Sequence, residues 1–594
     1  MKSGLKILVG LVLFVLFFSN SQNIASGQAG TSTLRGTVTD QQGGAVAHSI
    51  VSIKNSSGFS RAQETTAAGA YSFDLIPVGD YEVTVQAAGF RKAEFTSVHA
   101  LVGNIVTLDV KLEIGSAAQT VQVEAGTSDV QINTQDATLG NTIVGAQITQ
   151  LPIEGRDVRV LLTLQPGVTP DGYVAGARSD QSNITLDGID VNDAQTNGIN
   201  DAVLRLNSEA IEEFRVNTVN ANANEGRSSA AQVNLVTKSG SNQWHGSAFE
   251  LYRGSLFEAN SWFSNKSGVP RTKLVLNTFS GGLGGPIVKD KLFFFYNYEG
   301  QRQATAKPVV DVVPLPSLGQ GIINYTYCTD PTCNTFLPAS LNAPQVQQVY
   351  SAAGINPAAL AALADAAKKY PANDTSVGDG LNTSGFRFNA PLPIKLNSHF
   401  ARFDWAVNQK QNVFVRLNYI SDNQADPINL EAFPDTPIPG IWNHPYGIAV
   451  GHTWTITNNL VNNFRYGLTR QAFTFGGDSF GNDISFRFVF QPTNQVHSIS
   501  RVTPVHNIRD DLSLNHGKHV FQFGANIRKV NNSRVSFANA FDNAITNPSF
   551  YLGAGDRVSN DFQQYLNNNG LKGDQNSGQS LNSISETQNA ATAI

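Results

Sequence analysis

Residues 401–420 read ARFDWAVNQKQNVFVRLNYI, and their spacing decides the fold of the second half of the chain. Residues 401–408 alternate, so an extended chain places them on two faces: Ala401, Phe403, Trp405 and Val407 on one, and Arg402, Asp404, Ala406 and Asn408 on the other. Residues 413–420 and 521–528 repeat this period. The wall of a transmembrane barrel needs such alternation because it meets lipid on one face and water on the other. A soluble β-sandwich has the same period, so alternation alone predicts strands and not a membrane.

The lengths of the connections favour the barrel. Strands are predicted at 244–254, 273–287, 292–302, 399–408, 412–422, 447–457, 460–475, 510–515 and 519–530. Long and short connections alternate between them, and the short ones are 288–291, 409–411, 458–459 and 516–518. Outer-membrane barrels have short periplasmic turns and long external loops, whereas a sandwich has no reason for this parity. We therefore expect a mainly β fold in which residues 241–594 form an incomplete antiparallel transmembrane β-barrel.

Composition narrows the possible functions. Of the 594 residues, 15% are charged, well below the roughly 25% of ordinary soluble domains, so something other than water is expected to cover much of the surface. The formal charge of -5 offers no basic excess for a phosphate backbone, which argues against nucleic acid as a partner. A mean hydropathy of -0.17 excludes a bundle of membrane helices.

The N-terminus has the pattern of a secretory signal peptide. Lys2 and Lys6 precede or adjoin an apolar run at 7–18, which is too short to span a bilayer comfortably. Small residues at 25–27 follow, so residues 1–27 are predicted to be cleaved from an exported chain. The alternative is an N-terminal membrane anchor.

Residues 33–113 are predicted to form a small β-sandwich, because short alternating strands are separated by Gly, Asp and Pro turns. Its expected core is Leu34, Val38, Ile50, Ile53, Tyr71, Phe73, Tyr81, Val83 and Val85. The strings LRGTVTD at 34–40 and GAYSFDLIPVGDYEVTVQAAGF at 69–90 resemble the carboxypeptidase regulatory-like, transthyretin-type domain. The resemblance implies a domain without catalytic activity.

A Gly-flanked linker at 114–127 contains QTVQVEA at 119–125. Val121 and Val123 alternate with polar neighbours, which suits an extended segment that adds a strand to the sheet edge of a partner. The segment resembles the TonB box of outer-membrane transporters. That resemblance implies that a TonB-type energy-coupling protein binds Gln119, Thr120, Val121, Gln122, Val123, Glu124 and Ala125. An ordinary interdomain strand is the alternative interpretation.

Residues 128–240 are predicted to form a small α+β plug domain. The string EAIEEFRVNTVNANANEGRSSAAQVNLVTKSG at 209–240 resembles the end of the plug of TonB-dependent receptors, where a strand, a polar loop and a final strand precede the barrel. The loop here is rich in Asn and Ser, so it departs from the glycines expected at this place. The adjacent acids Glu212 and Glu213, like Asp510 and Asp511, are interpreted as surface charges.

The string NTFSGGLGGPIVKDKLFFFYNYEGQR at 277–302 gives the most specific resemblance, to the Oar-like branch of TonB-dependent receptors. Its glycines do not fit a phosphate-binding loop, because no Lys-Ser/Thr pair follows and Pro286 leads into a strand. Phe293, Phe294, Phe295, Tyr296 and Tyr298 are expected in the membrane-facing band and its aromatic girdle; a soluble aromatic core strand is the alternative. Because the resembled family has a barrel of about 22 strands, the chain is expected to hold part of it.

No catalytic, cofactor or metal site is predicted. The histidines form no HExxH, and the G-x-S-x-G string around Ser479 is followed by an extended sequence instead of the helix that a nucleophile elbow requires. Cys328 and Cys333 are predicted to form a small loop-stapling disulfide in an oxidising compartment, in preference to a metal site. The Ala-rich residues 343–369 are expected to be helical within a long external loop.

The resemblance implies a TonB-dependent receptor or transporter in the outer membrane, surrounded by lipid, with its N-terminal domains in the periplasm. It implies a substrate of the siderophore, oligosaccharide or peptide class, without choosing among them. One alternative is a non-transporting surface protein that binds carbohydrate or protein for adhesion. A soluble secreted β-rich binding protein is a third interpretation.

Overall fold

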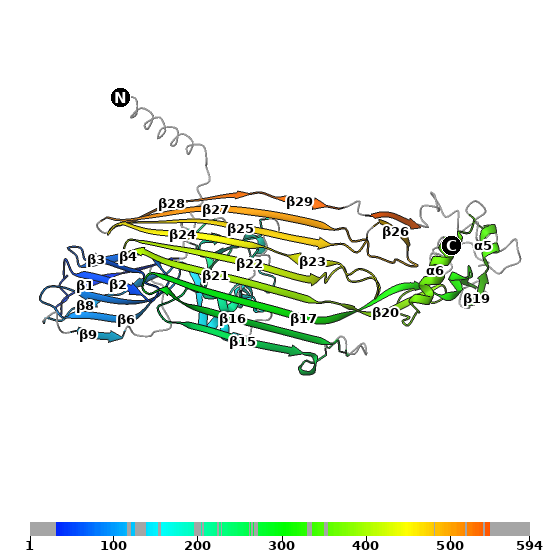
Figure 1. Ribbon diagram of the computed structural model, residues 1–594, viewed down its shortest axis with the longest axis horizontal. Helices are drawn as coiled ribbons and strands as arrows, with labels where there is room; N and C mark the ends of the chain where they lie inside the picture. Colours follow the sequence, from blue (N-terminus) through cyan, green and yellow to red (C-terminus); the bar gives the residue numbers. More distant parts are fainter. Residues whose placement is uncertain are drawn as a thin grey trace, which may run out of the picture.

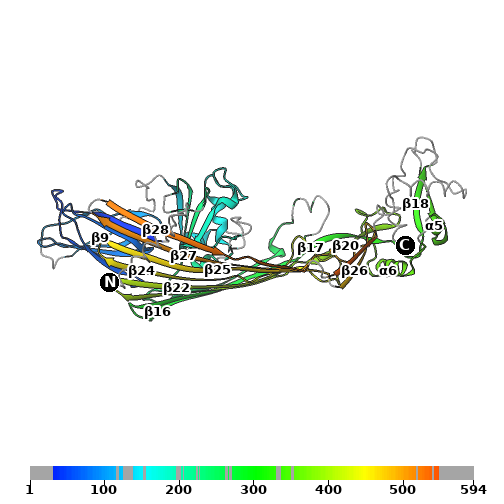
Figure 2. The same ribbon diagram turned by 90° about the horizontal axis from the view of Figure 1, so that it is seen from above.

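The computed structural model describes residues 31–115, 120–124, 138–151, 156–194, 203–204, 207–221, 225–226, 228–260, 262, 265, 271–328, 336–349, 354–479, 481–516, 519–537 and 541–546. An N-terminal domain lies at one end of a long curved sheet, and a module built from the long loops lies at the other end; it is called the external loop module below, after the orientation expected from the sequence (Figure 1). A small inner domain lies against one face of the long sheet (Figure 2). None of the helices in the described ranges is long and apolar enough to cross a membrane.

Two sheets make up the N-terminal domain. One contains β1 (Thr31–Thr39), β4 (Ala70–Pro77), β7 (Ile105–Thr107) and β8 (Val110–Lys111). The other contains β2 (Ile50–Asn55), β3 (Ser60–Glu64), β5 (Gly79–Gln86), β6 (Lys92–Ala100) and β9 (Thr120–Glu124). The inward residues of both sheets form one buried core, as a β-sandwich requires.

The core prediction for this domain is confirmed at every position except Ile50. Ile50 is 48% exposed, whereas its neighbour Val51 is fully buried. Because successive side chains of a strand point to opposite faces, Ile50 cannot share a face with Ile53, which is buried three residues later. The strand was predicted correctly, but Ile50 was assigned to the wrong face of it.

The inner domain is a five-stranded sheet in the order β10-β13-β14-β11-β12. Its strands are β10 (Leu139–Val144), β11 (Asn183–Leu186), β12 (Ile189–Asp190), β13 (Ile211–Val219) and β14 (Gln232–Thr237). Helix α2 (Gly145–Gln150) and the 3-10 turns η2 (Val158–Leu164), η3 (Ser179–Gln181) and η5 (Ser208–Ala210) connect them. Its apolar core also includes Leu396 and Ile420 from the long sheet, so the two bodies are packed together.

The long sheet, called the wall below, is antiparallel at every neighbouring pair of its spanning strands. In order these are β15 (His245–Gly254), β16 (Leu274–Val288), β17 (Leu292–Pro314), β21 (Ile394–Asn408), β22 (Gln411–Ala425), β24 (Tyr446–Thr457), β25 (Leu460–Gly476), β27 (Ile499–His516) and β28 (His519–Val530). The shorter β20 (Thr383–Pro391), β23 (Gly440–Asn443) and β29 (Ser533–Ser536) extend the far end of the sheet. Each strand predicted from the sequence is present.

The predicted parity of the connections is also confirmed. The short connections 289–291, 409–410 and 458–459 lie at the end of the wall next to the N-terminal domain, and β27 and β28 are separated by only two residues. The wall strands are longer than predicted: β17 continues to Pro314 and β27 begins at Ile499. Part of the sequence assigned to external loops therefore extends the sheet instead.

Alternation along the wall separates two environments. Phe403, Trp405, Leu417 and Tyr419 lie exposed on the outer face, whereas Arg402 and Arg416 face the inner domain. The prediction for the aromatic run in β17 was wrong for two residues. Phe293 and Phe295 are buried on the inner side, and Tyr296 is 41% exposed on the outer side. Five consecutive or near-consecutive aromatics cannot all face lipid in a strand of period two.

The external loop module contains α4 (Pro316–Gly319), β18 (Ile323–Cys328), β19 (Phe336–Leu341), α5 (Ala343–Val349) and α6 (Pro357–Lys369). The paired strands β26 (Gly481–Phe486) and β30 (Phe541–Thr546) lie beside it. Asn356 caps α6 by accepting hydrogen bonds from the backbone N–H groups of Ala358 and Ala359, and Pro357 opens the helix. The predicted helical segment is therefore real, but it is divided into two helices.

Candidate functional site: the contact between inner domain and wall

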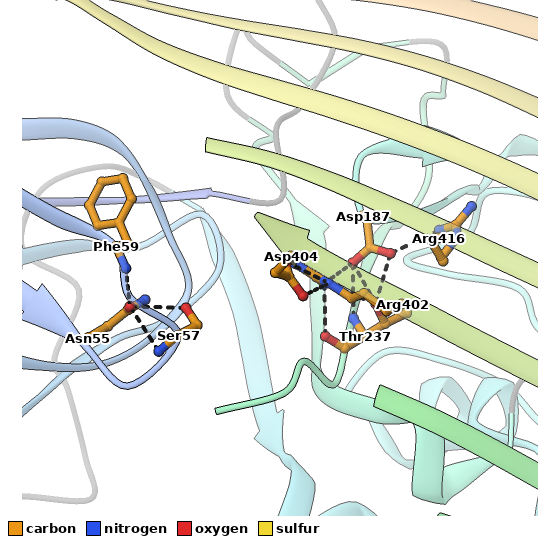
Figure 3. A network of polar contacts seen from close by, with 8 residues as sticks. All are labelled: Asn55, Ser57, Phe59, Asp187, Thr237, Arg402, Asp404 and Arg416. Carbon is orange, nitrogen blue, oxygen red and sulfur yellow. Dashed lines mark hydrogen bonds and ion pairs between the residues drawn. The ribbon is translucent and has the colours of Figure 1, made fainter. Parts of the chain in front are cut away.

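A tight hairpin of the inner domain supplies the acidic side of this contact. Asp187 and Gly188 join β11 to β12 with φ angles of 49° and 79°, the left-handed backbone that a two-residue type I′ turn requires. Gly supplies this conformation without strain and Asp tolerates it. The turn places the Asp187 carboxylate at the tip of the hairpin, facing the wall (Figure 3).

Two wall arginines meet that carboxylate. Arg402 of β21 donates from Nη1 to Asp187 Oδ1 at 3.3 Å, and Arg416 of β22 donates from Nη1 to Asp187 Oδ2 at 3.0 Å (Figure 3). The backbone N–H of Thr237 donates to Asp187 Oδ1 at 3.0 Å. Burial alone would raise the pKa of Asp187, but Arg402, Arg416 and Thr237 together hold it below its usual value. The aspartate is therefore ionised in the folded protein.

Further acids on the same segment meet more strands of the wall. We call residues 183–193 the acidic hairpin, since they carry Asp187, Asp190 and Asp193. Arg528 of β28 forms an ion pair with Asp190, and Gln471 of β25 donates to Asp193. Thr469 Oγ1 donates to the backbone carbonyl of Asp190 at 2.9 Å. The acidic hairpin thus bonds to at least four strands of the wall, β21, β22, β25 and β28.

The sequence analysis placed the acidic hairpin within the α+β domain at 128–240 and assigned no role to its charges. The Asp-Gly dipeptide between apolar residues was the available signal, because it is the strongest short-range indicator of a hairpin. The partners were not available, since Arg402 and Arg416 lie more than 200 positions away along the chain. Asp511, interpreted as a surface charge, in fact binds Arg509 Nε at 2.7 Å on the inner face.

The N-terminal domain is held to the inner domain by a clamp on the backbone of one residue, Val102. Glu213 of β13 accepts a hydrogen bond from the backbone N–H of Val102 at 2.8 Å, and Arg215 Nη1 donates to the carbonyl of Val102 at 3.0 Å. Glu213 is buried, which corrects its interpretation as a surface charge. Burial raises the pKa of Glu213 to about 8, against the lowering effect of the Val102 hydrogen bond.

A cavity of about 1380 Å³ lies where the three bodies meet. The N-terminal domain lines it with Asp80 and His99, the inner domain with Glu212 and Thr237, and the wall with residues that include Arg465. The wall also touches the N-terminal domain directly. A Cβ at Gly58, whose φ is 80°, would lie 2.9 Å from the carbonyl oxygen of Asp290 in a short turn of the wall.

The TonB-box-like segment is placed only in part. Thr120–Glu124 form strand β9 at the edge of a sheet of the N-terminal domain, parallel to β6, with Val121 opposite Ala93. Gln119 and Ala125 lie outside the described residues. The segment is therefore extended, as predicted, and in this structure it lies on its own chain. Whether a TonB-type protein binds it stays a prediction.

The predicted disulfide falls outside the described part of the chain, since Cys333 and the side chain of Cys328 are not described. Within the described ranges, no group of three or more His, Cys, Asp or Glu side chains could hold a metal ion. Ser479 donates to Thr493 Oγ1 at 2.8 Å and precedes strand β26, so the extended sequence expected after it is confirmed.

Comparison with known proteins decides the family. Residues 236–591 match the model of the outer membrane beta barrel domain, which covers more than half of the chain. The chain belongs to this family of outer-membrane β-barrels. Residues 33–113 match the carboxypeptidase regulatory-like domain, which confirms the resemblance found in the sequence. The outer face of the wall is accordingly the face toward lipid.

The relatives of this outer-membrane β-barrel protein are transporters and receptors. It is 26% identical over 292 residues to the TonB-dependent transporter Oar of Myxococcus xanthus, covering 46% of this chain and 27% of the relative. The outer membrane transporter YddB from Escherichia coli is similar at 12% identity and a TM-score of 0.43, over 66% of this chain and 48% of that chain. The siderophore receptor PirA from Acinetobacter baumannii is similar at 14% identity and a TM-score of 0.39, over 65% and 47%.

This β-barrel protein therefore spans about a quarter of the length of its curated relative and about half of the solved receptors. Its outer-membrane location follows from the family, as predicted. The Myxococcus xanthus relative is a transporter and not an enzyme.

Proposed function

We propose that the protein is a TonB-dependent receptor or transporter in which the inner domain, at 138–237, is a plug inside the barrel. The observation that carries this proposal is the set of bonds between the acidic hairpin and the wall. Buried charge pairs hold two bodies in a defined register, and they separate when one body is pulled because each partner can regain water. Such a contact suits a plug that stays in place until a pulling force is applied to it.

We propose that the short-turn end of the wall is periplasmic and that energy arrives there. In barrels of this kind short turns face the periplasm, and the N-terminal domain with β9 lies at the same end. A TonB-type protein would pair with β9 through backbone hydrogen bonds and transmit force along the chain toward β10. In the sequence, residues 125–137 link the end of β9 to the start of the inner domain.

The substrate is proposed to enter from the opposite end, where the external loop module lies. Its buried core joins residues from several loops, and the ring of Tyr370 stacks on that of Phe433 at 4.1 Å between centroids. The siderophore, oligosaccharide and peptide classes remain the candidates. The same folded module favours a second candidate function, a surface receptor for adhesion that binds carbohydrate or protein without transport.

The geometry of the wall sets a condition on barrel closure. The nine spanning strands are joined by antiparallel pairs throughout, so the two edges β15 and β28 run in the same direction. In a bilayer an unpaired strand edge is costly, because its backbone groups have no water to bond. Antiparallel closure then needs an odd number of further strands between the two edges. Two copies of this wall joined edge to edge would meet as parallel strands.

Replacing one residue of β9 tests the proposed energy coupling. Val121→Pro removes the backbone donor at the centre of the strand, whereas Val121→Thr keeps it and preserves β-propensity. We expect Val121→Pro to abolish accumulation of labelled substrate from a panel of ferric siderophores, oligosaccharides and peptides, while surface binding persists. A protonophore should have the same effect on the wild type, and Val121→Thr should transport normally.

The results separate the two candidate functions. Accumulation that survives both Val121→Pro and the protonophore would refute energy-coupled transport through β9. Specific surface binding that is never followed by accumulation in the wild type would instead support the adhesion receptor.

A further inference from the structure

Two cross-strand pairs of arginines lie on the inner face of the wall. Arg402 lies opposite Arg416 in the register of β21 and β22, and Arg465 lies opposite Arg509 in the register of β25 and β27. We call these four residues the arginine belt. Like charges placed directly opposite one another destabilise a sheet, so each pair needs nearby carboxylates.

Three members of the arginine belt have a carboxylate, and two of them find it two residues along the same strand. Arg402 Nη2 donates to Asp404 Oδ1 at 2.8 Å, and Arg509 Nε donates to Asp511 Oδ2 at 2.7 Å. Residues two apart share a face of a strand, which explains the repeated spacing. Arg416 takes its carboxylate from Asp187 of the acidic hairpin instead.

Arg465 is different, because the positions two residues away hold Asn463 and Gly467. The Arg465 side chain is only 3% exposed, and among the described residues nothing accepts a hydrogen bond from its Nε or Nη1. The neighbouring Asn463 also has an unpartnered buried Oδ1, while its Nδ2 donates to Thr453 Oγ1 at 2.9 Å. The carboxylate of Asp511 lies on the neighbouring strand, opposite Asn463, but it binds Arg509. Leaving the buried Nε and Nη1 of Arg465 without an acceptor is costly, so this end of the belt has room for one more acceptor group.

Arg465, Asn463 and Thr453 all line the cavity of about 1380 Å³. The acids that line the same cavity are Asp80 of the N-terminal domain, Asp187, Glu212 and Glu213 of the inner domain, and Asp404 of the wall, which is already bonded to Arg402. The cavity therefore gives a solute access to the unsatisfied guanidinium.

We propose that Arg465 is the anchor of an oxyanion-binding site in this cavity, with Asn463 and Thr453 as polar neighbours. A guanidinium offers parallel N–H donors that match the two oxygens of a carboxylate or phosphate group. A small solute that bears one of these groups would supply the charge that Asp404 and Asp511 supply to their own arginines. This inference concerns binding alone and does not rest on transport.

A single substitution can test the proposal by building the missing carboxylate into the chain. Asn463→Asp reproduces the two-residue spacing of the Arg402–Asp404 and Arg509–Asp511 pairs. It should therefore occupy Arg465 and exclude an external anion. Asn458→Asp makes the same charge change in an exposed short turn, away from the cavity, and is the matched control.

The measurement is equilibrium dialysis of the full chain in detergent micelles with labelled inorganic phosphate, and separately with labelled succinate, at constant ionic strength. We expect saturable binding of at least one of the two probes by the wild type and by Asn458→Asp. Binding of that probe should weaken at least about tenfold in Asn463→Asp and in Arg465→Gln, as expected when a charge-assisted hydrogen bond is lost. The preferred probe identifies the oxyanion class.

The thermal unfolding midpoint gives a second readout. The preferred probe should raise the midpoint of the wild type and of Asn458→Asp but no longer raise that of Asn463→Asp. The proposal is overturned if the wild type binds neither probe saturably, or if Asn463→Asp retains wild-type affinity. Because Asn463→Asp keeps Arg465 in place, the test holds even where Arg465→Gln does not fold.

Discussion

Glu213 and Arg215 hold the backbone of Val102 on both sides of its Cα, one accepting from its N–H at 2.8 Å and the other donating to its carbonyl at 3.0 Å. The two side chains lie two residues apart on β13, so they share a face of the strand. This clamp joins the N-terminal domain to the proposed plug, and it contains a titratable group whose pKa lies near the pH of ordinary media.

The clamp predicts pH-dependent docking of the N-terminal domain. Burial raises the pKa of Glu213 to about 8 from a usual value of 4.5, with Glu212 and Asp80 adding to the rise. A folded-state pKa above the unfolded value gives stability that is complete below about pH 4.5 and is lost as the pH rises through about 8. Hydrogen exchange at Val102 should therefore show looser docking at pH 9 than at pH 6, beyond the intrinsic effect of pH on exchange.

Glu213→Gln should reduce that dependence, because the amide oxygen can still accept from Val102 but does not titrate. Glu82→Gln, on an exposed position of β5, is the control and should behave as wild type. An unchanged pH dependence in Glu213→Gln would assign the effect to another group.

Asp187→Asn should loosen the proposed plug. The substitution leaves Arg402 and Arg416 buried without their shared carboxylate, and breaking a buried ion pair in this way costs about 3–5 kcal/mol. The loss should appear as faster hydrogen exchange in β14, whose Thr237 bonds to Asp187. Asp180→Asn removes the partner of Arg178 from an exposed pair on the same domain and should change little. Equal exchange in the two variants would contradict a special role for Asp187.

The register of β2 is tested by two identical changes on one strand. Ile53→Ala empties part of the N-terminal core and should destabilise the domain by about 2–5 kcal/mol. Ile50→Ala, at a half-exposed position, should cost much less. The two variants are compared by unfolding the full chain in denaturant and measuring, at each denaturant concentration, how readily a protease cleaves the N-terminal domain. Similar losses of stability in both variants would instead support the prediction from the sequence that Ile50 belongs to the core.

A charged substitution tests whether the outer face of the wall contacts lipid. Leu417 of β22 is 40% exposed on that face, so Leu417→Arg would place a guanidinium in lipid and should cost up to about 2–4 kcal/mol, depending on its depth. Ile428, 85% exposed in an external loop, gives the control Ile428→Arg, which should insert normally. Unfolding from lipid bilayers in urea measures the difference. A negligible cost for Leu417→Arg would remove Leu417 from the lipid-facing band.

The sequence by itself determined the local structure of this protein. A strand has a period of two whatever it packs against, so the alternation at 401–420 was enough to predict β21 and β22, and the parity of short turns was enough to order the wall. The Gly, Asp and Pro turns similarly defined the N-terminal sandwich. These properties depend on neighbours along the chain.

Only the tertiary structure decided which face of each strand lies inside and which distant charges meet. Nothing local distinguishes Ile50 from Val51, or Phe293 from Phe294, until a second layer covers one of each pair. Asp187 and Arg416 are 229 positions apart, and among the described residues nothing accepts a hydrogen bond from the buried Nε and Nη1 of Arg465. A charge acquires its environment from burial and from partners brought together by folding, and a linear sequence specifies neither directly.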